Sequence, residues 1–167
     1  PPDRNAVQAM LDAVEYIDII IPRGSQNLIN FVRENAKVPT IETGAGICHT
    51  YVHSSADVAK AQAIVTNAKV SRPSVCNALD CLVIDTDRIA DLPVIIADLA
   101  QHEVVIYADE RSYDVIKESY PEALLEHATD ESFGTEFLSL KMSIKTVDDF
   151  EEALAHIAQY SSKHSDC

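Results

Sequence analysis

Cys76 is the residue of this 167-residue chain whose type and position most favour chemistry. It lies in the run Arg72-Pro-Ser-Val-Cys-Asn-Ala78, after a stretch with helical spacing and just before the apolar run Leu79 to Ile84. A cysteine in such a helix-to-strand loop can be exposed and surrounded by backbone N–H groups, which favour the nucleophilic thiolate. Arg72 and the turn that begins at Cys76 are candidate sources of positive potential. The alternative is a thiol that packs in the core.

The other cysteines favour structural interpretations. Cys48 and Cys81 each lie inside an apolar run, so we expect both in the core. Four cysteines in a chain of this length, without a secretory signal, are typical of free thiols. Cys48 and His49, with His53 and Cys76, are conceivable metal ligands, but the chain has no Cys-x-x-Cys or His-x-x-x-His pair. We therefore expect no metal site.

Charge and hydropathy exclude several classes of partner. The chain carries 27 acidic and 13 basic residues, a formal net charge of −14, which argues against binding to nucleic acid or to an anionic membrane. No apolar stretch reaches the roughly 18 to 20 residues of a membrane span, and the N-terminus lacks the regions of a signal peptide. We expect a cytoplasmic protein whose partners are small molecules or other subunits.

Helical and strand patterns alternate along the chain, which predicts an α/β fold with a largely parallel sheet flanked by helices. Three- and four-residue apolar spacing and capping residues predict helices over 4–14, 25–35, 54–69, 88–101, 111–120 and 148–160. Apolar runs and partial alternation predict strands over 17–22, 38–41, 47–52, 79–84, 103–107 and 135–147. The last seven residues, 161–167, show no pattern that would hold them, so we expect them to fray or to belong to structure beyond the chain's end.

Several segments resemble one enzyme family in order and spacing over nearly the whole chain. They are Ile20-Ile-Pro-Arg-Gly-Ser25, Gly44-Ala-Gly-Ile-Cys-His49, Asn67-Ala-Lys69, Arg72-Pro-Ser-Val-Cys-Asn-Ala78, Gly134-Thr-Glu-Phe-Leu138 and His164-Ser-Asp166. Together they look like gamma-glutamyl phosphate reductase, also called glutamate-5-semialdehyde dehydrogenase, of the aldehyde dehydrogenase superfamily. The run around Cys76 is the most specific of these segments.

The resemblance implies a reaction of proline biosynthesis, in which NADPH reduces L-glutamyl 5-phosphate to glutamate 5-semialdehyde and phosphate is released. Cys76 matches the family's catalytic cysteine, whose thiolate forms a thioester that accepts hydride from the nicotinamide. The backbone N–H of Cys76 is expected to stabilise the oxyanion, as in the superfamily. The superfamily's second donor, an upstream asparagine, is not in this chain, and we do not transfer its role to Asn77.

The resemblance also suggests binding residues. Glu136 looks like the superfamily glutamate that accepts hydrogen bonds from the nicotinamide ribose, against the alternative of a solvated charge. Gly24 and Ser25 match a turn under the dinucleotide at the start of a helix. Arg23 is a candidate for a phosphate group of cofactor or substrate, although turn arginines are more often solvated.

Two further family positions are weaker. His164 lies in a family motif and is a candidate contact for the substrate phosphate or amino-acid head group. Glu42 falls where hydrolytic aldehyde dehydrogenases keep a general base, but a thioester that is reduced needs no activated water. Ser161 replaces the family's usual glycine after tyrosine, which puts the local turn in doubt.

The expected organisation follows from the same resemblance. Residues 1–43 should be a C-terminal remnant of a Rossmann-like cofactor domain, and residues 44–167 a catalytic domain that is incomplete at its C-terminus. We expect a fragment with little activity alone, from an enzyme that forms a homo-oligomer and associates with a glutamate 5-kinase. The preference for NADPH over NADH and the oligomeric state are not readable from these residues. The competing hypothesis is a stand-alone α/β binding module in which Cys76 is a non-catalytic or redox-sensing thiol.

Overall fold

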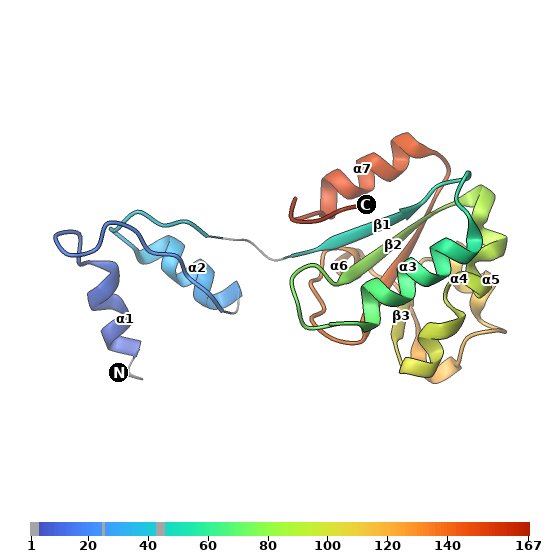
Figure 1. Ribbon diagram of the computed structural model, residues 1–167, viewed down its shortest axis with the longest axis horizontal. Helices are drawn as coiled ribbons and strands as arrows, with labels where there is room; N and C mark the ends of the chain where they lie inside the picture. Colours follow the sequence, from blue (N-terminus) through green and yellow to red (C-terminus); the bar gives the residue numbers. More distant parts are fainter. Residues whose placement is uncertain (1–3, 25, 43–45) are drawn as a thin grey trace. The chain divides into compact units, whose positions relative to one another are not determined.

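The computed structural model describes residues 4–24, 26–42 and 46–167. The chain divides into two compact units, residues 1–45 and 46–167 (Figure 1). The predicted boundary between residues 43 and 44 lies close to this division. The assignment of the first unit to a cofactor domain stays a prediction.

The N-terminal unit contains the two predicted helices, α1 (Arg4–Leu11) and α2 (Gln26–Asn35). The strands predicted over 17–22 and 38–41 are wrong, because these segments share only one parallel bridge, Ile20 to Thr40. The Ile20 N–H donates to the Pro39 carbonyl at 2.9 Å, and the Ile41 N–H donates to the Ile20 carbonyl at 3.0 Å. Pro39 has no N–H to extend the ladder. Among the described residues of this unit, no third segment pairs with either one.

The C-terminal unit is built on a five-stranded sheet in which every pairing is parallel, as predicted. The strands are β1 (Cys48–Val52), β2 (Leu79–Asp85), β3 (Val105–Ala108), β4 (Leu125–His127) and β5 (Lys141–Val147). Their order in the sheet is β1-β2-β5-β3-β4. The sequence pattern did not predict the short strand β4.

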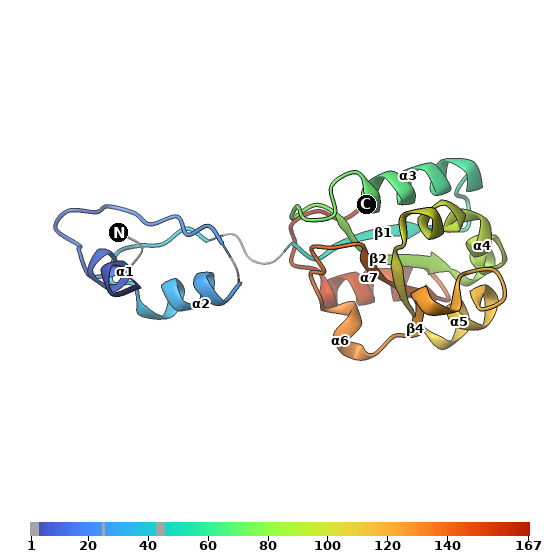
Figure 2. The same cartoon turned by 90° about the horizontal axis from the view of Figure 1, so that it is seen from below.

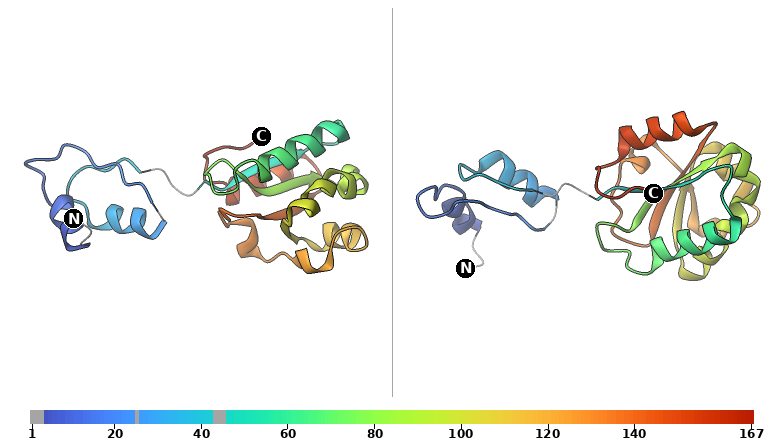
Figure 3. Two further views of the ribbon diagram at one scale, coloured as in Figure 1. Left: turned by 60° about the horizontal axis from the view of Figure 1, so that its bottom comes forward. Right: turned by 45° about the horizontal axis from the view of Figure 1, so that its top comes forward.

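Helices cover both faces of this sheet. They are α3 (Val58–Val70), α4 (Leu92–Ile95), α5 (Glu110–Ile116), α6 (Asp130–Phe133) and α7 (Phe150–Tyr160), with 3-10 helices at Thr86–Asp91, Ala97–His102 and Glu122–Leu124. Figures 1 and 3 show α3 and α7 on opposite faces of the sheet. Figure 2 shows α5 beside β4 at the far edge, where the two elements are in contact.

The alternation of side chains along β2 explains why this strand is mostly apolar, with Asp80 and Asp85 as its only charged residues. Leu82 and Ile84 enter the larger core beneath α3, α4 and α5, whereas Cys81 and Val83 enter a smaller core beneath α7. All seven residues of β2 are buried. A parallel strand covered on both faces reads as a continuous apolar run, which is the pattern that predicted it.

Three predicted elements differ in the structure. Residues 88–101 form a 3-10 turn, the short helix α4 and a second 3-10 turn instead of one helix. The strand predicted from residue 135 begins only at Lys141, and Leu138 has a left-handed φ of 50°, which an extended strand does not admit. The expectation that nothing holds residues 161–167 is wrong. Asp166 bridges to His49, and the Tyr51 N–H donates to the Cys167 carbonyl at 2.7 Å.

None of the helices in the described part of the chain combines the length and the apolar character that a membrane crossing requires.

Ile144, on the middle strand β5, is fully buried in the larger core, whereas Ile64 of α3 is 51% exposed. We expect Ile144→Ala to lower the free energy of unfolding by about 2–5 kcal/mol, because it leaves a cavity between packed layers. Ile64→Ala, the same change at the surface, should alter it by no more than about 0.5 kcal/mol. Urea denaturation followed by circular dichroism measures both. Equal effects of the two substitutions would contradict the placement of the core.

Candidate active site

Two of the sequence-predicted site residues, Cys76 and Glu136, lie at the same end of the sheet. Gly46 precedes β1, Cys76 precedes β2, and Glu136 precedes β5. These strands are neighbours in the order β1-β2-β5, and all run parallel. The amino ends of neighbouring parallel strands meet at one edge, so three segments far apart in sequence converge there.

Gly46 joins the two predicted residues directly. Its N–H donates to the Oε1 atom of Glu136 at 2.8 Å. A Cβ atom at position 46 would lie 2.0 Å from the carbonyl oxygen of Cys76, so the two backbones are in close contact. Only glycine permits this approach. The carboxylate of Glu136, the backbone of Gly46 and the loop of Cys76 are thus held in one continuous series of contacts.

Cys76 is exposed, and one polar group of the described residues binds its backbone. The Cys48 thiol donates to the Cys76 carbonyl oxygen at 3.2 Å. Burial raises the pKa of Cys48 to about 12, so Cys48 stays a neutral donor. The Cys76 N–H donates to no group within the described residues. With no acceptor among the described residues, this N–H can donate a hydrogen bond to an oxyanion, while the carbonyl oxygen already accepts from Cys48.

The turn predicted to begin at Cys76 is present, but it does not begin a helix. Helix α3 ends at Val70, before the loop, and residues 76–77 form a turn that leads into β2 without starting a helix. Among the described residues, the loop therefore offers the thiol no helix N-terminus.

A buried ion pair lies beneath the loop. Lys69, in the last turn of α3, is fully buried, and its Nζ atom lies 4.0 Å from the Oδ1 atom of Asp80 on β2. The same ammonium donates to the carbonyls of Leu79 at 2.5 Å and Lys141 at 2.7 Å. Lys69 thus fastens the start of the Cys76 loop to the first residues of both β2 and β5.

Asp80 extends this network to the rest of the site. Its Oδ1 atom accepts the N–H of Phe137 at 3.0 Å, and its Oδ2 atom accepts the N–H of Cys48 at 3.4 Å. Burial raises the pKa of Asp80 to about 6, against the effect of these donors and of Lys69. Burial also lowers the pKa of Lys69 to about 8, against the attraction of Asp80. Both groups lose hydration on burial, and their mutual attraction and their hydrogen bonds to the backbone compensate part of this cost.

Glu136 keeps part of its carboxylate available. Its side chain is half-buried in the segment between α6 and β5. The prediction that Glu136 lies in a strand over 135–147 is therefore wrong. Oε1 is occupied by Gly46, whereas Oε2 accepts no hydrogen bond from the described residues. A fixed carboxylate with one open oxygen suits a hydroxyl donor such as a sugar.

The remaining predicted residues lie elsewhere. Arg23 and Gly24 belong to the N-terminal unit just before α2, where Gly24 has a φ of 150°, and Ser25 lies outside the described residues. In the same unit, the Oε1 atom of Glu42 lies 3.8 Å from the Nη1 atom of Arg33. His164 is exposed in the segment after α7. The binding roles suggested for these residues stay predictions.

The sequence analysis missed three residues that build the site. Gly46 and Lys69 lie in segments that resemble the family, but the sequence suggested no role for either side chain or backbone. Asp80 offered a usable signal, because an acidic residue inside the apolar run 79–84 must find a buried partner.

The contact of Gly46 with Cys76 can be tested by adding one methyl group. We expect Gly46→Ala to lower the free energy of unfolding by about 1–3 kcal/mol, because the Cys76 carbonyl must move to admit the Cβ atom. Gly134→Ala is the matched control, since its Cβ atom would lie 3.4 Å from Tyr160, at ordinary contact distance. Urea denaturation compares the two variants. Equal stability of the two would contradict the close approach.

The buried ion pair makes a second prediction. Lys69→Met should cost about 3–5 kcal/mol of unfolding free energy, because it leaves Asp80 charged and unpaired in the interior. Lys60→Met, on an exposed position of the same helix, should cost no more than about 0.5 kcal/mol. The double variant Lys69→Met with Asp80→Asn should be more stable than the sum of the single effects predicts. Strict additivity in urea denaturation would count against a coupled pair.

The chain is similar to known proteins in sequence and in structure. No protein-family model matches the chain. A gamma-glutamyl phosphate reductase from Parabacteroides distasonis is 60% identical over 166 residues, which are 99% of this chain and 40% of the relative. The gamma-glutamyl phosphate reductase of Chlorobium luteolum is also 60% identical over 166 residues, with the same coverage of 99% and 40%. The chain therefore spans 40% of the length of these curated relatives.

Solved structures also include a gamma-glutamyl phosphate reductase that is similar to this chain. The crystal structure of gamma-glutamyl phosphate reductase from Thermotoga maritima matches 98% of this chain and 38% of its own, with a TM-score of 0.90 and 39% identity. A propionaldehyde dehydrogenase from Clostridium phytofermentans covers 99% of this chain at a TM-score of 0.71 and 16% identity, which shows the fold alone. Over nearly its whole length, the chain is thus homologous to gamma-glutamyl phosphate reductases and has an aldehyde dehydrogenase-like fold.

Proposed function

We propose that the protein to which this chain belongs reduces L-glutamyl 5-phosphate to L-glutamate 5-semialdehyde in proline biosynthesis, with Cys76 as the nucleophile. One observation carries the proposal. The thiol that matches the family's catalytic cysteine is exposed, and its backbone touches Gly46, whose N–H is bound by Glu136. The exposure of Cys76 also argues against the alternative that it is a core thiol.

The chemistry of Cys76 begins with attack on the acyl phosphate. The thiolate sulfur bonds to the carbonyl carbon, the carbon–oxygen bond to phosphate breaks, and phosphate leaves with its electron pair. The unpaired N–H of Cys76 is the donor that this chain supplies to the oxyanion of the tetrahedral intermediate. The product of this step is a glutamyl thioester on Cys76.

Reduction of that thioester requires a hydride donor. A nicotinamide cofactor, when bound, supplies the hydride that releases the aldehyde and regenerates the thiolate. The open Oε2 atom of Glu136 fits a ribose hydroxyl, since the Gly46 N–H holds the carboxylate in place through Oε1. Gly24 and Ser25, with Arg23, are proposed to contact the cofactor or substrate phosphates. The choice of NADPH rests on the resemblance to the family.

Reduction of a thioester needs no activated water, so the proposed reaction requires no general base. Glu42, which occupies the position of the hydrolytic base, lies 3.8 Å from the Arg33 guanidinium in the N-terminal unit. We propose no proton-transfer role for it. We propose His164 as a contact for the substrate head group, and we retain homo-oligomer formation and association with a glutamate 5-kinase as proposals.

Residues 1–167 alone are expected to show little reductase activity. The curated relatives contain further residues beyond the matched 40% of their length. Among the described residues, the N-terminal unit pairs only through the bridge of Ile20 and Thr40, which is not a dinucleotide-binding sheet. Reductase activity of the isolated chain would contradict this part of the proposal.

The role of Cys76 can be tested in a full-length protein that contains this chain. We expect Cys76→Ser to lower the rate of phosphate- and semialdehyde-dependent NADP⁺ reduction by at least about 10³-fold, because a serine hydroxyl at neutral pH is a poor nucleophile without a general base. Cys167→Ser is the matched control, since Cys167 is also exposed and lies outside the proposed site. It should keep the rate within about threefold, a change of under about 1 kcal/mol in the barrier. Absorbance of NADPH measures both rates, and retained activity in Cys76→Ser would refute the proposal.

A further inference from the structure

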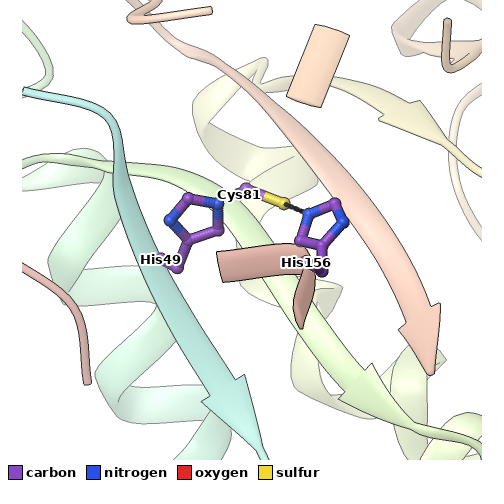
Figure 4. A group of neighbouring side chains, drawn as sticks. All are labelled: His49, Cys81 and His156. Carbon is purple, nitrogen blue, oxygen red and sulfur yellow. Dashed lines mark hydrogen bonds between the residues drawn. The ribbon is translucent and has the colours of Figure 1, made fainter. Parts of the chain in front are cut away.

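Two histidines and a cysteine meet inside the C-terminal unit, away from the loop of Cys76. His49 comes from β1, Cys81 from β2 and His156 from α7. All three residues are buried, and their ligand atoms lie within 4.8 Å of one another. Figure 4 shows the sulfur of Cys81 between the two imidazole rings. The sequence analysis considered a different set around Cys48 and His53 and did not identify this one.

His49 presents an unused ligand atom to this cluster. Its side chain is fully buried, and its Nε2 atom has no hydrogen-bond partner in the described residues. The other ring nitrogen, Nδ1, lies 3.0 Å from the Oδ1 atom of Asp166. A carboxylate at Nδ1 places the proton there and leaves the lone pair on Nε2. A carboxylate behind an imidazole is also the usual support of a metal-binding histidine.

The other two ligands are already at a suitable separation. The Cys81 Sγ atom lies 3.5 Å from the His156 Nε2 atom. A tetrahedral zinc ion holds a sulfur and a nitrogen ligand about 3.5 Å apart, given its bond lengths of about 2.3 and 2.0 Å. The ligand atoms of the cluster lie within 4.8 Å of one another, a limit roughly 1.3 Å longer than this distance. Small rotations of the His49 and His156 side chains close that gap.

We propose that His49, Cys81 and His156 form a binding site for a divalent d¹⁰ metal ion such as Zn²⁺. Two imidazoles and one thiolate are the ligand types that this class of ion prefers. The ion joins β1, β2 and α7, so it acts as a cross-link between α7 and the sheet. The site does not depend on the proposed enzymatic function, because it uses neither Cys76 nor Glu136.

The protonation of the cluster agrees with this role. Burial lowers the pKa of His49, against the effect of Asp166, and it lowers the pKa of His156 to about 4, so both imidazoles are neutral. Burial raises the pKa of Cys81 to about 12, so the free thiol keeps its proton. A bound divalent ion displaces that proton, and one proton is released to solvent for each ion bound.

Cobalt(II) is a suitable probe, because its bond to a thiolate produces a charge-transfer absorption band. The titration uses the double variant Cys76→Ser with Cys167→Ser, which removes both exposed thiols. We expect one equivalent of Co²⁺ to produce the band, and Zn²⁺ to displace it. Saturating Zn²⁺ should also raise the midpoint of thermal unfolding by roughly 5–10 °C. No band and no thermal shift would refute the site.

Ligand assignment rests on matched variants in the same background. Cys81→Ser should abolish the band, whereas Cys48→Ser, at the other buried cysteine, should retain it. Persistence of the band in Cys81→Ser, or its loss in Cys48→Ser, would place the ion elsewhere and refute the assignment.

Asp166→Asn gives an independent test at a position that binds no metal directly. It should weaken Zn²⁺ binding about 10–100-fold, because the carboxylate that orients His49 is lost. Should Cys81→Ser fail to fold, this variant decides the question by calorimetric titration. Unchanged affinity in folded Asp166→Asn would overturn the proposal.

Discussion

The edge of the sheet that carries Cys76 and Glu136 depends on the buried pair of Lys69 and Asp80. One ammonium binds the first carbonyls of two strands, and one carboxylate binds the N–H groups that lead into β1 and toward β5. Neither charge would be tolerable alone in the interior, so each requires the other and the backbone around it. The pair therefore fixes the positions of three segments at once: the loop of Cys76, the segment of Glu136 and the start of β1.

The parallel topology brings the segments held by Lys69 and Asp80 together at one edge of the sheet. Because β1, β2 and β5 are neighbours with the same direction, their preceding loops emerge side by side. Gly46 then allows backbone contact with Cys76 that any side chain would prevent. The Cys76 residue is exposed, its N–H has no acceptor among the described residues, and its carbonyl oxygen accepts from the Cys48 thiol. The proposed acyl transfer requires this distribution of free and engaged groups.

Local pattern predicted α1, α2, α3, α5 and α7 and four of the five strands of the sheet, because burial on one or two faces leaves a clear periodic signal. It failed where tertiary context decides. Residues 17–22 and 38–41 are apolar, but with a single bridge between them they form no ladder. The predicted strand began too early, at residue 135 instead of Lys141, because the left-handed backbone of Leu138 leaves no pattern in the sequence. Cys76 and Glu136 were readable as single residues, but their link through Gly46 required the strand order, which local pattern does not encode.

Cys76 is proposed to form the glutamyl thioester, so trapping that adduct is a direct test of its role. A full-length protein containing this chain is incubated with glutamate 5-semialdehyde and NADP⁺ in the absence of phosphate, so that the thioester forms and its phosphorolysis is blocked. After acid quenching and proteolysis, mass spectrometry locates the added glutamyl group. The account predicts one adduct, on the peptide that contains Cys76. Modification of another cysteine, or turnover on adding phosphate without any adduct at Cys76, would contradict it.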